Sequence, residues 1–148
     1  MKQINLKGSW LIKAPIKGVF DIVTDFEKMP KNFPAVAKSI NIISRNGNNL
    51  IIDAQVKSFG KTFPVKMKTT IIQDQGFISD NESPIIGTSG HEELMLKETE
   101  VGTMINYIYQ VDIHKPLLRI IAKPLVGWFA MKFWKRAFID KLKAILEN

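Results

Sequence analysis

The fold is decided by the stretch Leu117-Leu-Arg-Ile-Ile-Ala-Lys-Pro-Leu-Val-Gly-Trp-Phe-Ala-Met-Lys-Phe-Trp-Lys-Arg-Ala-Phe-Ile-Asp-Lys-Leu-Lys-Ala-Ile-Leu146, the longest window with helical character. In its second half, apolar residues recur at helical spacing: Val126, Ala130, Phe133/Trp134, Ala137/Phe138 and Ile145. The opposite face of that half carries Lys132, Arg136, Asp140 and Lys143. Residues 125–131 have no polar face, so a helix there must be covered on every side or must line an apolar space.

Pro124 determines where this helix is expected to begin. Inside a helix, this residue would lose a backbone hydrogen bond, and its ring would clash with Ile120. We therefore predict that the main helix begins at about Pro124, and that residues 117–122 form a separate turn or a kinked lead-in.

The rest of the chain has the periodicity of strands with two short helical segments near its start. Alternating apolar and polar residues predict strands at 4–12, 36–45, 50–57, 63–71, 76–79, 91–99 and 103–114. A short helix is predicted at 15–24, with Pro15 suited to its first position. Residues 25–34 carry two prolines and predict a broken second helix or a turn, and residues 81–84 predict a loop.

The spacing of these strands indicates how they pair. Asn46-Gly-Asn-Asn49 is a strong hairpin signal, and further turn signals separate the strands that follow it. Strands at hairpin spacing with one apolar face predict a meandering antiparallel sheet. Such a sheet has one face to bury, and the long helix needs cover, so packing them together gives a two-layer α+β domain.

Length and composition are those of one ordinary globular domain spanning residues 1–148. The apolar content is 45% and the charged content 24%, and no apolar run reaches the roughly 20 residues needed to span a bilayer. The N-terminus lacks the apolar core of a signal peptide, and there is no cysteine, which fits a cytoplasmic protein. Two histidines, His91 and His114, argue against a multi-histidine metal site.

Most of the formal net charge of +7 lies near the C-terminus. Residues 115–147 contain eight basic and two acidic residues. We favour a solvated helix face as the explanation. The alternatives are that the basic residues contact an anionic membrane surface or an acidic protein partner. In the first case the protein would be peripherally associated with a membrane. Nucleic acid is not expected as a partner, because no motif for reading it accompanies the charge.

Three local motifs, in this order of elements, resemble one superfamily. They are Ile12-Lys-Ala-Pro-Ile-Lys-Gly-Val-Phe-Asp21, Asp25-x-Glu-x-x-Pro-x-x-x-Pro34, and Gly102-Thr103 before the last strand. Together with the order strand, two short helices, six strands and a long C-terminal helix, they resemble the START-like (helix-grip, SRPBCC) superfamily, nearest its polyketide cyclase/dehydrase and coenzyme Q-binding branches. The resemblance implies a curved antiparallel sheet of about seven strands wrapped around the C-terminal helix.

The same resemblance implies a type of site. Members of the superfamily bind lipids, sterols, quinones, plant hormones or polyketides between the sheet and the long helix, and some catalyse cyclisation or dehydration. A fold does not decide among these activities. No cofactor is implied.

The candidate site is the sheet face predicted to look toward the helix. Most of its apolar residues are expected to be core, but a sheet that curves away from the helix would leave an apolar cavity with a few polar groups. Tyr107, Tyr109, Glu92 and Thr69 would supply those groups, since buried tyrosine hydroxyls need a partner. The residues predicted to contact a ligand are Met67, Glu92, Leu94, Ile105, Tyr107, Tyr109, Val126, Phe129, Ala130 and Phe133.

The sequence gives no clear catalytic or metal-binding residues. Glu92 shares the inward parity of Leu94 but lies near a strand end, so we favour a rim or salt-bridge role over a buried acid. His91, Glu92 and Glu93 do not form a metal site, because adjacent strand residues point to opposite faces. No nucleophile–base pair is recognisable, so no catalytic residue is assigned.

Three hypotheses for function follow. We prefer a non-enzymatic carrier or sensor of a hydrophobic small molecule. The second is a cyclase- or dehydratase-like enzyme that uses Glu92 with the tyrosine pair as acid and base, so whether the protein is an enzyme stays open. The third is a membrane-surface or protein-partner module that uses the basic helix and exposed aromatic residues such as Trp128. An exposed apolar patch at Leu125, Trp128 and Phe129 would suit a dimer.

Overall fold

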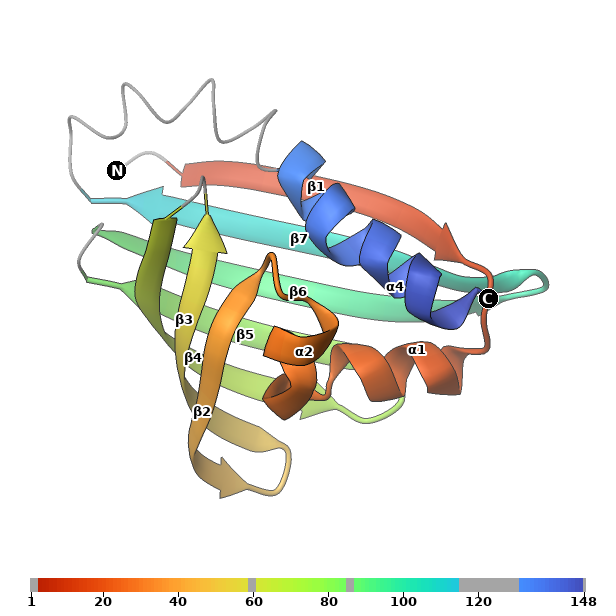
Figure 1. Cartoon of the computed structure of the whole chain (residues 1–148), viewed down its shortest axis with the longest axis horizontal. Coiled ribbons are helices and arrows are strands. Elements are labelled where there is room, and N and C mark those ends of the chain that lie inside the picture. Colours follow the sequence, from red (N-terminus) through yellow and green to blue (C-terminus); the bar gives the residue numbers. More distant parts are fainter. Residues whose placement is uncertain (1–2, 59–60, 85–86, 115–130, 148) are drawn as a thin grey trace.

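A computed structural model of the chain describes residues 3–58, 61–84, 87–114 and 131–147 (Figure 1). Its strands are β1 (Gln3–Ile12), β2 (Ala37–Asn46), β3 (Asn49–Ser58), β4 (Lys61–Ile72), β5 (Gly76–Ser83), β6 (Thr88–Thr99) and β7 (Gly102–Ile113). Between β1 and β2 lie α1 (Ile16–Val23), the 3-10 turn η1 (Phe26–Lys28) and α2 (Met29–Asn32). The segment predicted as a broken second helix is therefore two short helical turns.

The seven strands form one antiparallel sheet in the order β1-β7-β6-β5-β4-β3-β2. All consecutive strands from β2 to β7 are neighbours, and β1 closes the order by pairing with β7 along its whole length. Figure 1 shows the sheet bending around the C-terminal helix, with α1 and α2 on the same side of the sheet. The predicted α+β helix-grip architecture is confirmed.

The C-terminal helix comprises residues 131–146 of the described chain. Residues 131–134 are α-helical, Lys135–Ile139 form a π-helical turn (η2), and Asp140–Leu146 form α4. The predicted start at Pro124, the lead-in at 117–122 and the aromatic patch around Trp128 lie outside the described residues. No helix in the described ranges is both long and apolar enough to cross a membrane.

An aromatic column joins this helix to the sheet and to Phe33, the residue that follows α2. Phe138 stacks on Phe33 at 4.3 Å between ring centroids and on Trp134 at 4.7 Å. Trp134 stacks in turn on Tyr107 of β7 at 3.9 Å and meets Trp10 of β1 at 5.2 Å. Four contacts among five aromatic side chains thus fix the helix against the concave side of the sheet, and each contact adds to the burial of apolar area.

Strand β5 is longer than its sequence predicts. Periodicity places a strand at 76–79 and a loop at 81–84, but β5 continues to Ser83, with Asn81 paired to Met67 of β4 and to Gly90 of β6. Residues Asn81 to Ser83 are polar and have low strand propensity, so pairing with strands on both sides decides their conformation. The greater length of β5 matters for the site, because it turns the Asn81 and Ser83 side chains toward the concave side of the sheet.

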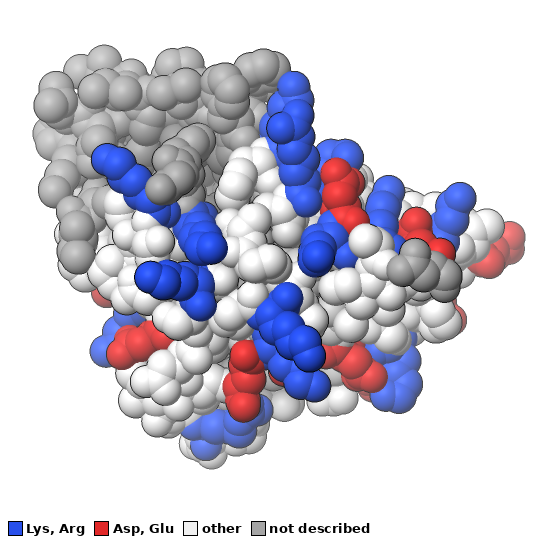
Figure 2. Space-filling model, viewed as in Figure 1, with Lys and Arg blue, Asp and Glu red and all other residues white. Residues whose placement is uncertain are grey.

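The face of the molecule that carries the helices has mixed charge. Figure 2 shows lysine and arginine side chains over the upper end of the C-terminal helix and over α2, with acidic side chains among them. On the helix, the Lys135 ammonium lies 3.0 Å from the Asp140 carboxylate. Contact of this face with an anionic membrane or an acidic partner stays a prediction.

Candidate ligand-binding cavity

A cavity of about 270 Å³ lies between the concave face of the sheet, α2 and the C-terminal helix. Its walls are mostly apolar. The apolar and aromatic lining residues are Leu6, Phe26, Met29, Val36, Ala37, Ile40, Val56, Phe63, Val65, Met67, Phe77, Leu94, Met131, Phe133, Trp134 and Phe138. The polar lining residues are Lys57, Asn81, Ser83, Thr88, Glu92, Tyr107 and Tyr109. An engineered protein cavity of roughly 150 Å³ accepts benzene, so this one is large enough for a bigger apolar ligand.

Strand alternation and register bring the polar groups together. In the register of the sheet, Thr69 of β4 is paired with Ser79 of β5, Ser79 with Glu92 of β6, and Glu92 with Tyr109 of β7. These four residues therefore form one row across the sheet, all on the same face. Asn81 and Tyr107 lie two residues from members of this row on their own strands and so share that face.

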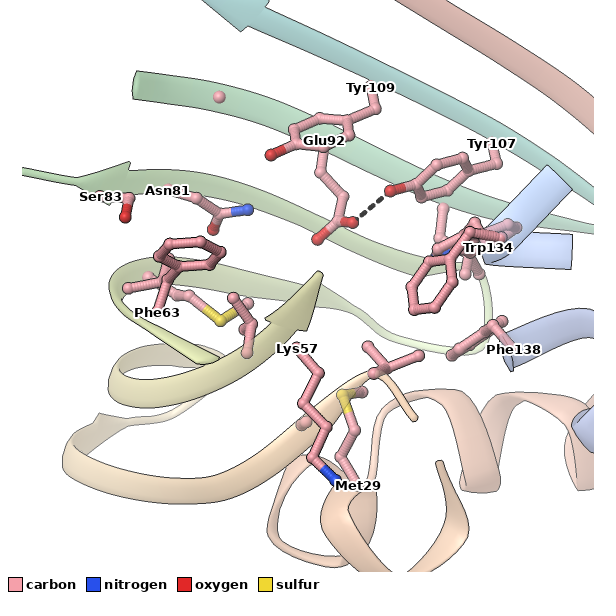
Figure 3. Close-up of a pocket in the computed structure, with 18 of the residues that line it drawn as sticks. Met29, Lys57, Phe63, Asn81, Ser83, Glu92, Tyr107, Tyr109, Trp134 and Phe138 are labelled. Carbon is pink, nitrogen blue, oxygen red and sulfur yellow. Dashed lines mark hydrogen bonds between the residues drawn. The ribbon is translucent and has the colours of Figure 1, made fainter. Parts of the chain in front are cut away.

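Glu92 and Tyr107 form the central contact of this cluster. The Tyr107 hydroxyl donates a hydrogen bond of 2.5 Å to Glu92 Oε2 (Figure 3). Burial raises the pKa of Glu92, and the interactions with Tyr107 and Asn81 partly oppose that rise. Burial, followed by the charge of Glu92, raises the pKa of Tyr107 well above its ordinary value, so this hydroxyl stays protonated and remains a donor.

A relay of hydrogen bonds orients Asn81 toward Glu92. The Thr69 and Ser79 hydroxyls are 2.9 Å apart, and the Ser79 hydroxyl donates to Asn81 Oδ1 at 2.7 Å. Because Ser79 uses its hydrogen for Asn81, the Thr69 hydroxyl is the donor to Ser79. The oxygen of Asn81 is thus occupied, and its NH₂ group points toward the Glu92 carboxylate (Figure 3).

Tyr109 completes the polar cluster from β7. Its ring lies over Gly90, where an added Cβ would come within 2.5 Å of the ring and 2.9 Å of the hydroxyl oxygen. A side chain at position 90 would therefore displace the ring. Burial, and after it the charge of Glu92, raises the pKa of Tyr109, so its hydroxyl is also a donor. No hydrogen-bond acceptor for that hydroxyl occurs among the described residues.

Lys57 is the cationic residue among the described lining residues, and it does not neutralise Glu92. In Figure 3 its amino group lies beside Met29, on the other side of the cavity. In the described part of the chain, no ion pair involves Glu92. The carboxyl group is therefore held by neutral donors alone.

The structure places the predicted ligand-contacting residues as follows. Met67, Glu92, Leu94, Tyr107, Tyr109 and Phe133 line the cavity. Ile105 is fully buried in the core and does not line it. Val126, Phe129 and Ala130 lie outside the described residues. Glu92 is inside the cavity rather than at a rim or in a salt bridge, because β6 begins at Thr88 and places it in the fifth position of the strand.

Sequence reasoning misses several lining residues. Asn81 and Ser83 are hidden by the predicted loop, and their polar character gives no strand signal. Phe26 and Met29 belong to the proline-containing segment, for which the sequence predicts no packing partner. Lys57 sits at the end of β3, where the alternation predicts an outward position.

His91 lies on the other face of β6 and bridges two carboxylates. Its Nδ1 is 2.7 Å from Asp80 Oδ1, and its Nε2 is 2.8 Å from Glu93 Oε2. Ionised carboxylates only accept hydrogen bonds, so the His91 ring can donate to both of them when it is protonated and both of its nitrogens carry hydrogen. No group of three or more potential ligands suited to a metal ion occurs among the described residues.

This arrangement makes a prediction about pH. The bonds to Asp80 and Glu93 raise the pKa of His91 above its ordinary value of 6.5, so its contribution to stability is complete below pH 6.5 and is lost as the pH rises through the folded-state pKa. Because the ring is about one-third exposed, we expect less than about 1 kcal/mol. Urea denaturation across this pH range should show the loss in the native chain and not in His91→Gln. An NMR titration that gives His91 a pKa at or below 6.5 would contradict the bridge.

Comparisons with known proteins report on the fold. No family model matches the sequence, and no curated protein matches it. Among solved structures, the di-domain ARO/CYC StfQ from the steffimycin biosynthetic pathway aligns with a TM-score of 0.84 at 13% identity, over 98% of this chain and 51% of that one. Zhui aromatase/cyclase from Streptomyces sp. R1128 gives 0.79 at 10% identity, over 99% and 94%. A START superfamily protein from Mycobacterium smegmatis gives 0.76 at 14% identity, over 98% and 97%.

These similarities place the chain in a fold class. It has the START-like helix-grip fold, shared with the aromatase/cyclases and the START superfamily protein named above, as the resemblance in its sequence implies. The chain spans about half the length of the di-domain proteins it matches. At 10–14% identity, the likeness to these structures describes the fold and not the activity.

Proposed function

We propose that this protein binds a hydrophobic small molecule in the cavity between the sheet and the C-terminal helix. The observation that supports this most directly is a space of about 270 Å³ with largely apolar walls and a cluster of polar groups converging at one part of it. Ligand sites are typically of this kind, in which apolar walls supply affinity and a few polar groups fix orientation.

The energetics of an apolar cavity favour the binding of an apolar ligand. Well-packed interiors leave few voids larger than a water molecule, and an apolar void forfeits dispersion contacts for the side chains around it. A ligand restores those contacts and removes its own apolar area from water, at about 25 cal/mol per Å². The names of the similar structures, aromatase/cyclases and a START superfamily protein, agree with a ligand of this class.

The direct test is native mass spectrometry of the protein purified from its own host, followed by extraction of whatever is bound. We expect a discrete additional mass that is lost on denaturation, and the extract identifies the ligand class. A bare mass, together with no uptake of apolar probes, would argue against the proposal.

A cavity-filling substitution should abolish this binding. Val65 of β4 lines the cavity and is partly buried, so Val65→Trp places a large ring in the space and should remove the additional mass. Lys66→Trp is the matched control, because it puts the same ring on the neighbouring, outward-facing and exposed position of β4. Circular dichroism confirms folding, since overpacking typically costs about 1–3 kcal/mol. Equal ligand retention by both variants would place the ligand elsewhere.

A second candidate is an enzyme of the cyclase or dehydratase type acting on such a ligand. The convergence of Glu92 with Tyr107 and Tyr109 in one cavity favours it, because proton transfer needs an acid or base with a shifted pKa beside the substrate. The test is conversion of the extracted ligand to a product of different mass or absorption. Unchanged turnover by Glu92→Gln would rule out Glu92 as the acid or base.

A further inference from the structure

We infer that the polar cluster formed by Glu92, Tyr109 and Asn81 binds a hydroxyl group of the ligand. This inference rests on the proposed function and specifies it: the ligand is an apolar molecule that carries an alcohol or a phenol at the end that faces the sheet. The residues that carry the inference are the three named ones, together with Tyr107, which holds the carboxyl group in place.

The three groups present two donors and one acceptor to the same region of the cavity. Figure 3 shows the Tyr109 hydroxyl, the Asn81 NH₂ group and the Glu92 carboxylate facing a common space. Tyr109 donates nothing to another described residue, so its hydrogen is available. Asn81 has two N–H hydrogens, and its oxygen is already engaged by Ser79. Glu92 uses Oε2 for Tyr107 and also interacts with Asn81, and because each carboxylate oxygen has two lone pairs, Oε1 can still accept a hydrogen bond from the cavity.

A hydroxyl group is the simplest ligand group that satisfies this pattern. It donates one hydrogen bond and accepts two, so it can donate to Glu92 Oε1 while accepting from Tyr109 and Asn81. When Glu92 is ionised, a hydrogen bond to it is about twice as strong as one to a neutral acceptor, so the donation to Glu92 should then dominate the preference.

Other ligand groups leave part of the cluster without a partner. A ketone or an ether accepts from Tyr109 and Asn81 but gives Glu92 nothing, and an ammonium donates to Glu92 but cannot accept from the two donors. A ligand carboxylate would lie against Glu92 in a site where Lys57 is turned away, so like charges would oppose its binding. An apolar end would give the Tyr109 hydroxyl no partner and would leave the remaining hydrogen-bonding capacity of Glu92 and Asn81 unused, which costs free energy where water is excluded.

Three probes of one shape separate these cases: 2-naphthol, 2-methoxynaphthalene and 2-methylnaphthalene. The first has a hydroxyl, the second retains the oxygen without its hydrogen, and the third has no polar atom. Dissociation constants from fluorescence titration are expected to favour 2-naphthol by about tenfold or more over each of the others. In Glu92→Gln and in Tyr109→Phe this preference should fall severalfold, while the affinity for 2-methylnaphthalene stays within about a factor of two to three.

A control variant removes a hydroxyl from the outer face of the sheet. Thr70 of β4 is exposed and points away from the cavity, next to the inward-facing Thr69, and Thr70→Val is close to isosteric. This variant should keep the full preference for 2-naphthol. Tyr109→Phe retains the ring over Gly90, so it tests the hydroxyl alone.

The outcomes separate the inference from the proposed function. Equal binding of all three probes to the native chain would overturn the hydroxyl site and leave the apolar cavity supported. A preference for 2-naphthol that survives in both Glu92→Gln and Tyr109→Phe would also overturn it. Failure of every probe to bind at millimolar concentration would count against the cavity itself, and so against the proposed function.

Discussion

Replacing Phe138 with alanine should lower the free energy of unfolding by about 3–5 kcal/mol, a large part of the roughly 5–15 kcal/mol that holds a domain of this size together. The ring is 3% exposed and stacks on Phe33 on one side and on Trp134 on the other. Its removal eliminates both stacking contacts and leaves a cavity in the middle of the aromatic column. Chemical denaturation followed by circular dichroism measures the loss.

A matched control lies on the same helix. Phe133 has the same side chain but is 36% exposed, so Phe133→Ala should cost about 1 kcal/mol or less. Comparable losses for the two variants would mean that the C-terminal helix is not attached to the rest of the fold through Phe138. Because Phe133 lines the cavity, its variant also reports whether ligand affinity changes while stability does not.

The Phe138 column connects the stability of the helix to the geometry of the site. Trp134 stacks on the ring of Tyr107, the residue whose hydroxyl holds Glu92. Trp134 also contacts Trp10, whose ring lies over Gly8, so a side chain at position 8 would displace the Trp10 ring. The position of the helix and the position of the carboxyl group are thus set by shared contacts.

Much of the fold is predictable from the sequence because the physics that determines it is local. In β7, alternation alone places Tyr107 on the same face as Ile105, and both are buried on the concave side. The turn at Asn46-Gly-Asn-Asn49 is equally local, since Gly47 adopts the positive φ of +61° that this hairpin needs. Burial and turn chemistry act over a few residues, which is the range that a sequence pattern reports.

The site is less predictable because it depends on pairing between distant strands. Asn81 enters the cavity only because β5 continues past its apolar part, between β4 and β6. The position of Glu92 in the cavity depends in the same way on where β6 begins, a boundary set by its pairing with β5 and β7. The contact between Tyr107 and Glu92 then follows from register, as Glu92 faces Tyr109 and Leu94 faces Tyr107. Neither these strand boundaries nor this cross-strand register can be predicted from the residue pattern of a single segment.

The second large effect concerns the hydrogen bond between Tyr107 and Glu92. Tyr107→Phe removes one hydroxyl and should lower the free energy of unfolding by about 1.5–3 kcal/mol when Glu92 is ionised, the range for a bond to a charged group. In a Glu92→Gln background the acceptor is neutral, and the same substitution should cost about 1 kcal/mol at every pH. The difference between the two backgrounds is the part of the bond that depends on charge.

The native chain, Tyr107→Phe, Glu92→Gln and the double variant form a double-mutant cycle, and the direction of its pH dependence can be derived. The pKa of Glu92 is raised above its ordinary value of 4.5, so the folded state binds the proton more tightly than the unfolded state, and stability is lost as the pH rises through the folded-state pKa. Removing the Tyr107 hydroxyl raises the pKa of Glu92 further, because a donor to the carboxylate is gone. The loss of stability with rising pH therefore becomes larger. The cost of Tyr107→Phe should therefore grow from about pH 5 to about pH 8.5. The titration of His91 on the outer face is common to all four proteins and cancels in the cycle. A cost that is the same at both pH values and in both backgrounds would show that Tyr107 does not hold an ionised carboxylate, and the hydroxyl site inferred for Glu92 would then lose its acceptor.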